Sequence, residues 1–409
     1  MKKMIGTLAL IAAVALVSCT AVAEGNRLLE AGMFESFAQL LWNGETLYAP
    51  SQNRMYTWQP GDEALTAWED GMAIAESLLG QDSAEGMSFA RYTLFLDNGS
   101  LRGLRLLYDD LGGLEGLAVC DICLEEGMVR TANAVAVNAP RELLGRDFYF
   151  TDVCGRDGTL FLLGEDENGA LLCCVDMAAS DKAHVEEVGG WGNGRLLSTA
   201  QGLLMAKENY DAECLTLSWV QEDGRLKPAF DLPMLNIYSL ATSEKGNVIY
   251  AMDKGKVCPV NLDDGELGAP VSALPVTPDS SSATDGNRFY AANLGSRVAI
   301  LDVTSPLPED SVLTMRGLDW SEGFREAMLQ FIVEHPEQAV AVNDADVGQE
   351  VLEELLTQSS EPDIYIINNS YNASYDALLE SGYMLPLDGS EVICGLIGSC
   401  RFPKNCGQC

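Results

Sequence analysis

A short glycine-led strand motif recurs along this 409-residue chain, and its spacing is the feature that most constrains the fold. The segments 246–251 (GNVIYA) and 286–291 (GNRFYA) are near copies of each other. Earlier copies begin at Gly202, Gly158 and Gly44, and from Gly158 onward neighbouring copies are 44 or 40 residues apart. Each copy opens with a turn glycine and continues into an apolar strand, so one supersecondary unit is repeated.

Asn-Gly and Asp-Gly pairs separate the apolar runs of the same region, at residues 98–99, 168–169, 223–224 and 264–265. Such pairs supply the positive φ angles that a tight hairpin requires. A period of 40 to 44 residues with two to four strands per unit predicts the blades of a β-propeller. We expect an all-β propeller-like domain over residues 24–310 with about six blades, or seven with a composite closing blade. The segment 97–123 fits the period poorly, and a pair of β-sandwiches is the competing fold.

After residue 308 the pattern changes to strands that alternate with helices. Residues 311–316 and 339–342 are expected strands. Between them, Phe324, Met328 and Phe331 belong to an apolar stripe at helical spacing that ends before Pro336. A third strand over 363–367 and two further helices follow. Repeated β-α-β order predicts a parallel sheet, so residues 311–409 are expected to form a partial α/β domain.

Four segments of this second domain resemble the opening of the extracellular solute-binding proteins of bacterial ABC importers. They are 313–317 (LTMRG), 331–336 (FIVEHP), 361–365 (EPDIY) and 380–388 (ESGYMLPLD), and their order and spacing carry the resemblance. The resemblance covers less than a quarter of the chain. It implies a periplasmic-binding-protein-like lobe that captures a small-molecule solute for an ABC permease.

Two loops are the ligand-binding candidates that the resemblance implies, because open α/β sheets bind ligands beyond the carboxyl ends of their strands. One holds Asn368, Asn369, Ser370 and Tyr371 after the third strand, and the other holds Trp320 after the first. Amide and hydroxyl groups beside an aromatic ring suit a sugar or a peptide. The alternative for the asparagine-rich loop is ordinary capping of a helix N-terminus.

The end of the chain departs from the solute-binding family. A complete member has two lobes, but this chain stops after three strand-helix units. Four cysteines then fall within residues 394–409, in a spacing that matches no metal site we can justify. A truncated or frameshifted gene end is the simpler interpretation, and a zinc knuckle or disulfide knot is the alternative.

The first 23 residues predict export. Lys2 and Lys3 precede an apolar run over 5–17 that is too short to span a bilayer comfortably, as in a signal peptide. The segment 16–19 (LVSC) resembles a bacterial lipobox, with Cys19 as the lipid attachment residue, and 21–23 (AVA) is an alternative site for ordinary signal peptidase. We therefore expect a cell-surface lipoprotein, anchored to the outer face of the cytoplasmic membrane by its N-terminal lipid.

Charge and composition argue against several functions. The formal net charge of −36 disfavours nucleic acid as a partner. His184 and His335 are the chain's two histidines, and neither has a recognisable catalytic partner nearby, so we expect no enzyme, no metal site and no cofactor. The segment 344–348 (DADVG) departs from a calcium loop in the position of its glycine. Cysteines 120, 123, 154, 214 and 258 could pair outside the cell, whereas Cys173 and Cys174 read as buried thiols.

The leading hypothesis from sequence is therefore the solute-binding component of an ABC transporter, in a truncated copy if the gene end is damaged. The alternative is a cell-surface β-propeller interaction protein without a transport role. A propeller enzyme ranks third because histidines are scarce.

Overall fold

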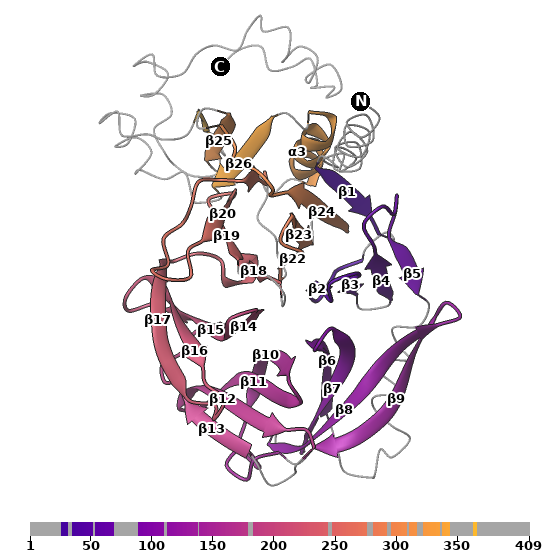
Figure 1. Ribbon diagram of the computed structural model, residues 1–409, viewed down its shortest axis with the longest axis vertical. Helices are drawn as coiled ribbons and strands as arrows, with labels where there is room; N and C mark the ends of the chain where they lie inside the picture. The colour runs from indigo at the N-terminus through magenta and orange to yellow at the C-terminus, as the bar shows by residue number, and fades with distance from the viewer. Residues whose placement is uncertain are drawn as a thin grey trace, which may run out of the picture.

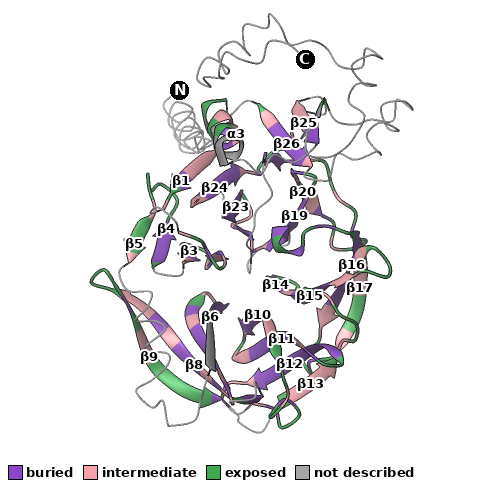
Figure 2. Ribbon diagram, turned by 180° about the vertical axis from the view of Figure 1, so that it is seen from behind, coloured by how far each residue is buried: buried purple, intermediate pink, exposed green. Residues whose placement is uncertain are grey.

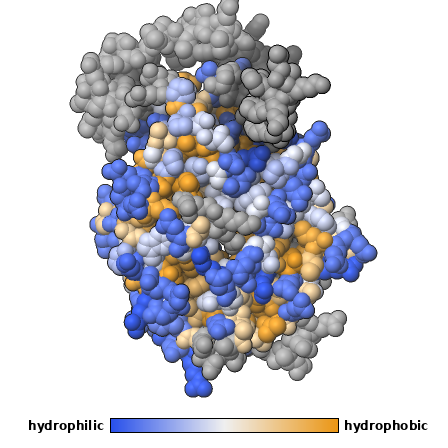
Figure 3. Space-filling model, viewed as in Figure 1, coloured by the Kyte–Doolittle hydropathy of each residue, from blue (hydrophilic) through white to orange (hydrophobic). Residues whose placement is uncertain are grey.

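The structure is a computed structural model, and it shows a ring of β-sheets with a small α/β segment at its periphery (Figure 1). It describes residues 26–31, 35–51, 54–68, 89–109, 113–137, 139–178, 183–243, 248–275, 281–292, 296–308, 311–316, 322–335, 338–343 and 363–365. Figure 3 shows hydrophilic side chains over much of the face in view, with smaller hydrophobic areas among them. The all-β propeller predicted from the repeat is confirmed.

The ring has six four-stranded antiparallel blades, in sequence order around a central axis. Blade 1 is β2 (Leu41–Trp42), β3 (Leu47–Pro50), β4 (Met55–Trp58) and β5 (Thr66–Trp68). Blade 2 is β6 (Phe89–Asp97), β7 (Ser100–Tyr108), β8 (Leu114–Glu125) and β9 (Met128–Val137). Blade 3 is β10 (Tyr149–Arg156), β11 (Thr159–Asp166), β12 (Gly169–Asp176) and β13 (Ala183–Glu187). Blade 4 is β14 (Gly194–Thr199), β15 (Gly202–Asn209), β16 (Cys214–Val220) and β17 (Leu226–Pro233). Blade 5 is β18 (Ala241–Thr242), β19 (Ile249–Asp253), β20 (Lys256–Val260) and β21 (Ser272–Ala273).

Blade 6 is composite and closes the ring. Its inner three strands are β22 (Ala283–Thr284), β23 (Arg288–Ala292) and β24 (Arg297–Asp302), and its outer strand is β1 (Arg27–Glu30) from the start of the described chain. β1 pairs antiparallel with β24 from Arg27 opposite Ile300 to Glu30 opposite Arg297. The sixth blade is therefore the composite one, and the described residues form no seventh.

The predicted turns lie where the repeat places them. Of the repeated glycines that the structure describes, Gly44, Gly158 and Gly286 lie in the turn between the first and second strands of a blade, and Gly202 follows that turn as the first residue of β15. The four Asn-Gly or Asp-Gly pairs lie at turns between consecutive strands of a blade, with Gly169 as the first residue of β12. The segment 97–123 fits the period poorly because blade 2 has long strands, of 9 to 12 residues. Figure 2 shows that its outer strand β9 is exposed over much of its length.

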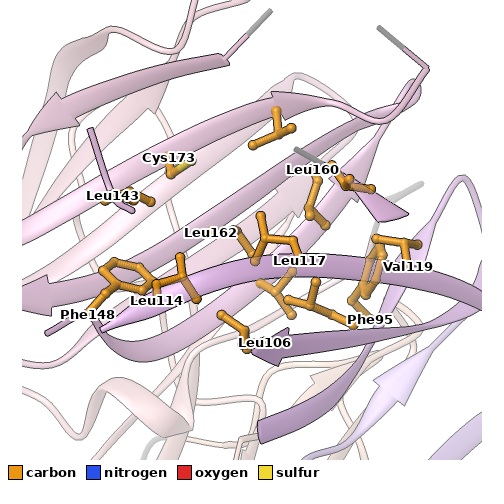
Figure 4. Packing of buried hydrophobic residues seen from close by; sticks show 14 of the residues in the cluster. Phe95, Leu106, Leu114, Leu117, Val119, Leu143, Phe148, Leu160, Leu162 and Cys173 are labelled. Carbon is orange, nitrogen blue, oxygen red and sulfur yellow. The ribbon is translucent and has the colours of Figure 1, made fainter. Parts of the chain in front are cut away.

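Blades 2 and 3 are joined into one eight-stranded sheet at a single point, where Gly155 of β10 lies opposite Asp97 of β6 in parallel pairing. A hydrophobic cluster fills the space between the two blades (Figure 4). Phe95 and Leu106 contribute from blade 2, and Leu160 and Leu162 from blade 3. These side chains are at most 1% exposed.

Polar groups on or just before the innermost strands link neighbouring blades. Gln39 donates to the Leu94 carbonyl, Asp152 accepts from the Leu196 N–H, Arg156 donates to the Thr199 carbonyl and Thr242 donates to the Ser198 carbonyl, all at 2.6 to 2.9 Å. Between blades 6 and 1, Tyr290 stacks on Trp42 with ring centroids 5.6 Å apart. The ring is therefore held by direct contacts around the axis as well as by core packing.

Arg195 of β14 links three blades by itself. Its Nη1 donates to the carbonyls of Tyr238, at 3.0 Å, and Leu240, before and at the start of blade 5. Its Nη2 donates to the Ser282 carbonyl, next to blade 6, at 2.8 Å. Burial lowers the pKa of Arg195, and burial raises the pKa of the nearby Asp152 although the Arg195 charge opposes that shift.

The described part of the segment after the ring consists of a three-stranded parallel sheet and helix α3. β25 (Val312–Arg316) pairs with β26 (Ala339–Asn343) on one side and with β27 (Ile364–Tyr365) on the other. Helix α3 (Glu322–Glu334) packs Leu329 and Ile332 into the core shared by blades 5 and 6. The segment therefore lies on the outer rim of the ring, where two blades meet (Figure 1).

Several predictions about single residues need correction. His184 lies on β13 opposite Cys174, with its Nε2 3.1 Å from Glu186 Oε2. Each described cysteine is a free thiol. Cys120 and Cys123 lie three positions apart on β8, so they point to opposite faces of the sheet and cannot pair. The buried state predicted for Cys173 and Cys174 is confirmed.

Candidate interaction surface

Four aromatic side chains are exposed on one face of the ring. In an antiparallel blade, the start of the innermost strand and the turn between the second and third strands lie on the same side, which we call the top face. Tyr149 begins β10, Trp191 precedes β14, Tyr210 follows β15 and Tyr238 precedes β18 in a single 3-10 turn (Ile237–Ser239). Their exposed fractions are 57%, 58%, 61% and 41%. We call these four residues the aromatic patch.

The loop that carries Trp191 is held by hydrogen bonds at both ends. Lys207, only 9% exposed, donates from Nζ to the carbonyls of Gly189 and Gly190, the latter at 3.0 Å. On the other side of Trp191 in the sequence, the Gly192 N–H donates to Glu165 Oε1 at 2.9 Å. Each side of the tryptophan is therefore tied to a strand of blade 3 or blade 4.

Gly192 lets the loop approach the neighbouring strand closely. Its φ is +145°, and a Cβ at this position would lie 2.7 Å from the Glu208 carbonyl oxygen. The next residue, Asn193, donates from its backbone and from its side chain to Glu208 Oε2, at 3.0 and 2.9 Å. Trp191 is thus presented on a loop whose shape is fixed before any partner binds.

Acidic groups border the aromatic patch. Tyr210 donates to Glu208 at 2.6 Å, and this hydrogen bond, with burial and the charges of Glu208 and Glu165, raises the pKa of Tyr210. Burial and then the Glu208 charge raise the pKa of Tyr238, to which Tyr149 also contributes. Because these groups shift the pKa of Tyr210 and of Tyr238, the three tyrosines Tyr149, Tyr210 and Tyr238 lie near one another and near Glu165 and Glu208. Asp211 and Glu213 are exposed in the adjoining turn between β15 and β16.

The axis of the ring holds a small polar cavity of about 100 Å³. It is lined by residues of all six blades, among them Asp152, Arg195, Thr242 and Ser282. The side-chain oxygen of Ser282 is buried without a hydrogen-bond partner. A cavity of this size holds a few water molecules, whereas pockets for drug-sized ligands are typically about 300 Å³ or more.

The site residues predicted from sequence lie outside the described residues. These are Asn368, Asn369, Ser370, Tyr371 and Trp320 on the two loops, and Cys19 at the lipobox. The structure tests none of them, nor the segment 344–348. Among the described residues, no group of three or more His, Cys, Asp or Glu side chains is placed to hold a metal ion. In the same part of the chain, no helix has the length and apolar character needed to cross a bilayer.

The aromatic patch was not predicted from the sequence. The segment 189–194 (GGWGNG) carried a usable signal. Its four glycines disfavour a regular strand or helix, so the tryptophan among them has no element against which to pack. Tyr149, Tyr210 and Tyr238 carry no comparable signal, because their exposure depends on how three blades are arranged around the axis.

Solved structures similar to this chain are β-propeller proteins. The β-propeller domain of Cps50 (Swd1) from Myceliophteria thermophila is 11% identical, with a TM-score of 0.41, over 68% of this chain and 100% of that domain. A chain of the mitotic checkpoint complex is 12% identical, with a TM-score of 0.42, over 69% of this chain and 96% of its own. Apo AztD from Citrobacter koseri is 13% identical, with a TM-score of 0.37, over 65% and 83%. No protein-family model and no curated protein matches the chain.

The predicted membership of the ABC solute-binding proteins is wrong, because the similar structures are propellers and none supports a periplasmic-binding-protein-like lobe. The predicted solute-binding function, with a small-molecule solute and an ABC permease as partners, is wrong for the same reason. The physical source of the error is that strand-helix-strand order with apolar strands describes any parallel sheet. The comparisons also give no support to the prediction of a lipoprotein, and lipid attachment at Cys19 stays a prediction from the sequence.

Proposed function

We propose that this chain is an exported interaction protein that docks a protein partner through the top face of its propeller, and that it acts by binding and not by catalysis. The observation that carries the proposal is the aromatic patch on its pre-shaped loop. Trp191 and Tyr210 are each more than half exposed, so the packing of their rings contributes little to the stability of the folded chain. Tryptophan and tyrosine are the side chains that most often anchor protein interfaces.

The fixed shape of the Trp191 loop supports binding in a second way. Ordering a mobile loop on association costs free energy, and a loop already held by Lys207, Glu165 and Glu208 avoids most of that cost. The axial cavity supports docking at the surface over capture inside the ring, because at about 100 Å³ it is too small for a sizeable ligand. Export rests on the signal-peptide pattern of residues 2–17.

Site-specific photo-crosslinking in the native host tests the proposal. A photoactivatable residue replaces Tyr210 on the top face or, as the matched control, Arg225 in the turn between β16 and β17 on the bottom face of the same blade. Both positions are well exposed, at 61% for Tyr210 and 73% for the Arg225 side chain. We expect a discrete protein adduct from position 210 that is absent from position 225 and is lost when Trp191→Ala is added. Equal adducts from both positions, or none from 210, would refute docking at the top face.

A further inference from the structure

The charges around the aromatic patch point to the chemistry of its partner. We infer that the patch recognises a basic, lysine- or arginine-bearing segment of a partner protein, an inference that rests on the proposed function and names its partner class. Two features must coincide for this: exposed aromatic faces, and an excess of negative charge within reach of them.

The aromatic faces are available to a cation. Trp191 and Tyr210 stand at 58% and 61% exposure, on a loop and a turn that lie side by side, because Asn193 and Tyr210 both bond to Glu208 Oε2. An ammonium or guanidinium group over such rings is attracted by their π electrons, with tryptophan the strongest. A flexible basic side chain can lie between them without displacing any bond that holds the loop.

The negative charge is compensated only in part. Glu165 and Glu208 accept hydrogen bonds from neutral donors, the N–H groups of Gly192 and Asn193 and the Tyr210 hydroxyl. Lys207 interacts electrostatically with Glu165, but its Nζ is directed to the carbonyls of Gly189 and Gly190 beneath the loop. Arg195, near Tyr238, is balanced by Asp152. Asp211 and Glu213 add exposed negative charge beside Tyr210. A neutral sugar would stack on the rings and donate hydrogen bonds to the carboxylates, but it would gain nothing from the excess negative charge, and an acidic segment would be repelled.

Binding of a labelled decalysine peptide to the full chain, followed by fluorescence anisotropy at several salt concentrations, tests the inference. We expect Trp191→Ala to weaken binding about fivefold or more, and Trp191→Phe to retain most of it. Glu208→Gln keeps a hydrogen-bond acceptor for Asn193 and Tyr210 but removes the charge, so it should weaken binding and flatten the salt dependence. A neutral glycine-serine peptide and a neutral oligosaccharide should not bind detectably. Circular dichroism confirms that each variant is folded.

The matched control separates the patch from the acidity of the whole chain. Asp157→Asn removes one charge in the turn between β10 and β11 on the bottom face, where the Asp157 side chain is 81% exposed. Equal weakening by Asp157→Asn and Glu208→Gln, or decalysine binding that ignores Trp191, would overturn the inference. So would tight oligosaccharide binding that depends on Trp191. If position 210 still cross-links a protein in those cases, the proposed function stands and only the basic partner class fails.

Discussion

At the scale of single residues, the ring depends on a few side chains that bridge blades near the axis. Arg195 is the clearest of them, because one guanidinium group serves carbonyls next to blades 5 and 6 from a position on blade 4. These carbonyls belong to segments that enter the innermost strands, and that of Tyr238 also accepts from the Ser282 N–H at 2.9 Å. A charged donor is strong enough to hold several such groups at once.

Arg195→Ala should lower the free energy of unfolding by about 2–3 kcal/mol, because carbonyls beside the axis lose a charged hydrogen-bond donor. The measurement is urea unfolding followed by circular dichroism. Arg225→Ala is the matched control, since that side chain is 73% exposed and its nitrogen lies 3.7 Å from the Asp223 carboxylate. We expect the control to change stability by less than about 0.5 kcal/mol. Similar losses in both variants would show that Arg195 is not a bridge.

At the scale of elements, blades 2 and 3 touch so closely that a glycine is required at the contact. A Cβ on Gly155 would lie 2.7 Å from the Asp97 Cβ and 2.8 Å from Phe95 Cε2. β6 and β10 can therefore join the two blades into one eight-stranded sheet because Gly155 has no side chain. The two strands pair at this position and not along their length.

Gly155→Ala should cost about 1–3 kcal/mol, because the added methyl group forces β10 away from β6. Gly116→Ala serves as the control within another strand, β8, where a Cβ would meet only Leu107 Cδ1, at 3.6 Å. Removing backbone freedom from the unfolded chain at that position should leave stability unchanged or slightly higher. Thermal unfolding of both variants checks the difference, and equal melting temperatures would contradict the close contact.

Among the elements of the fold, the tight turns were the easiest to predict from the sequence. Asn98-Gly99 has positive φ at both positions, 51° and 77°, as its sequence pair indicates. The helix stripe from Phe324 to Ile332 also predicted α3 correctly, to within two residues at its start. The aromatic patch was not predictable in the same way, because Tyr149 and Tyr238 belong to different blades and meet only when the ring has formed.

At the scale of the whole molecule, the closing blade determines whether the ring exists at all. Leu29 of β1 is 3% exposed and packs with Tyr290 and Ile300 of the same blade and with residues of blade 1. The repeat period indicated the number of blades, but it could not show which strand completes the last one, because β1 lies outside the repeated motif.

Leu29→Ala should lower the free energy of unfolding by about 2–4 kcal/mol through a cavity at the closing seam. Val135→Ala is the control, since it makes the same type of change on another outer strand where the side chain is 54% exposed. The control should remain within about 0.5 kcal/mol of wild type in urea unfolding. If the two losses were equal, the seam would contribute no more than an exposed strand does.

The pairing of β1 with β24 also imposes an order in time. Glu30 bonds to Arg297, a residue 267 positions later, so the first strand to be made is the last to find its place. Until Asp302 has emerged, five blades can assemble while β1 waits for the inner strands of the sixth blade, and its unpaired edge stays open to other chains. The time between the synthesis of β1 and the synthesis of β24 is therefore the period in which the chain is most open to association with other chains.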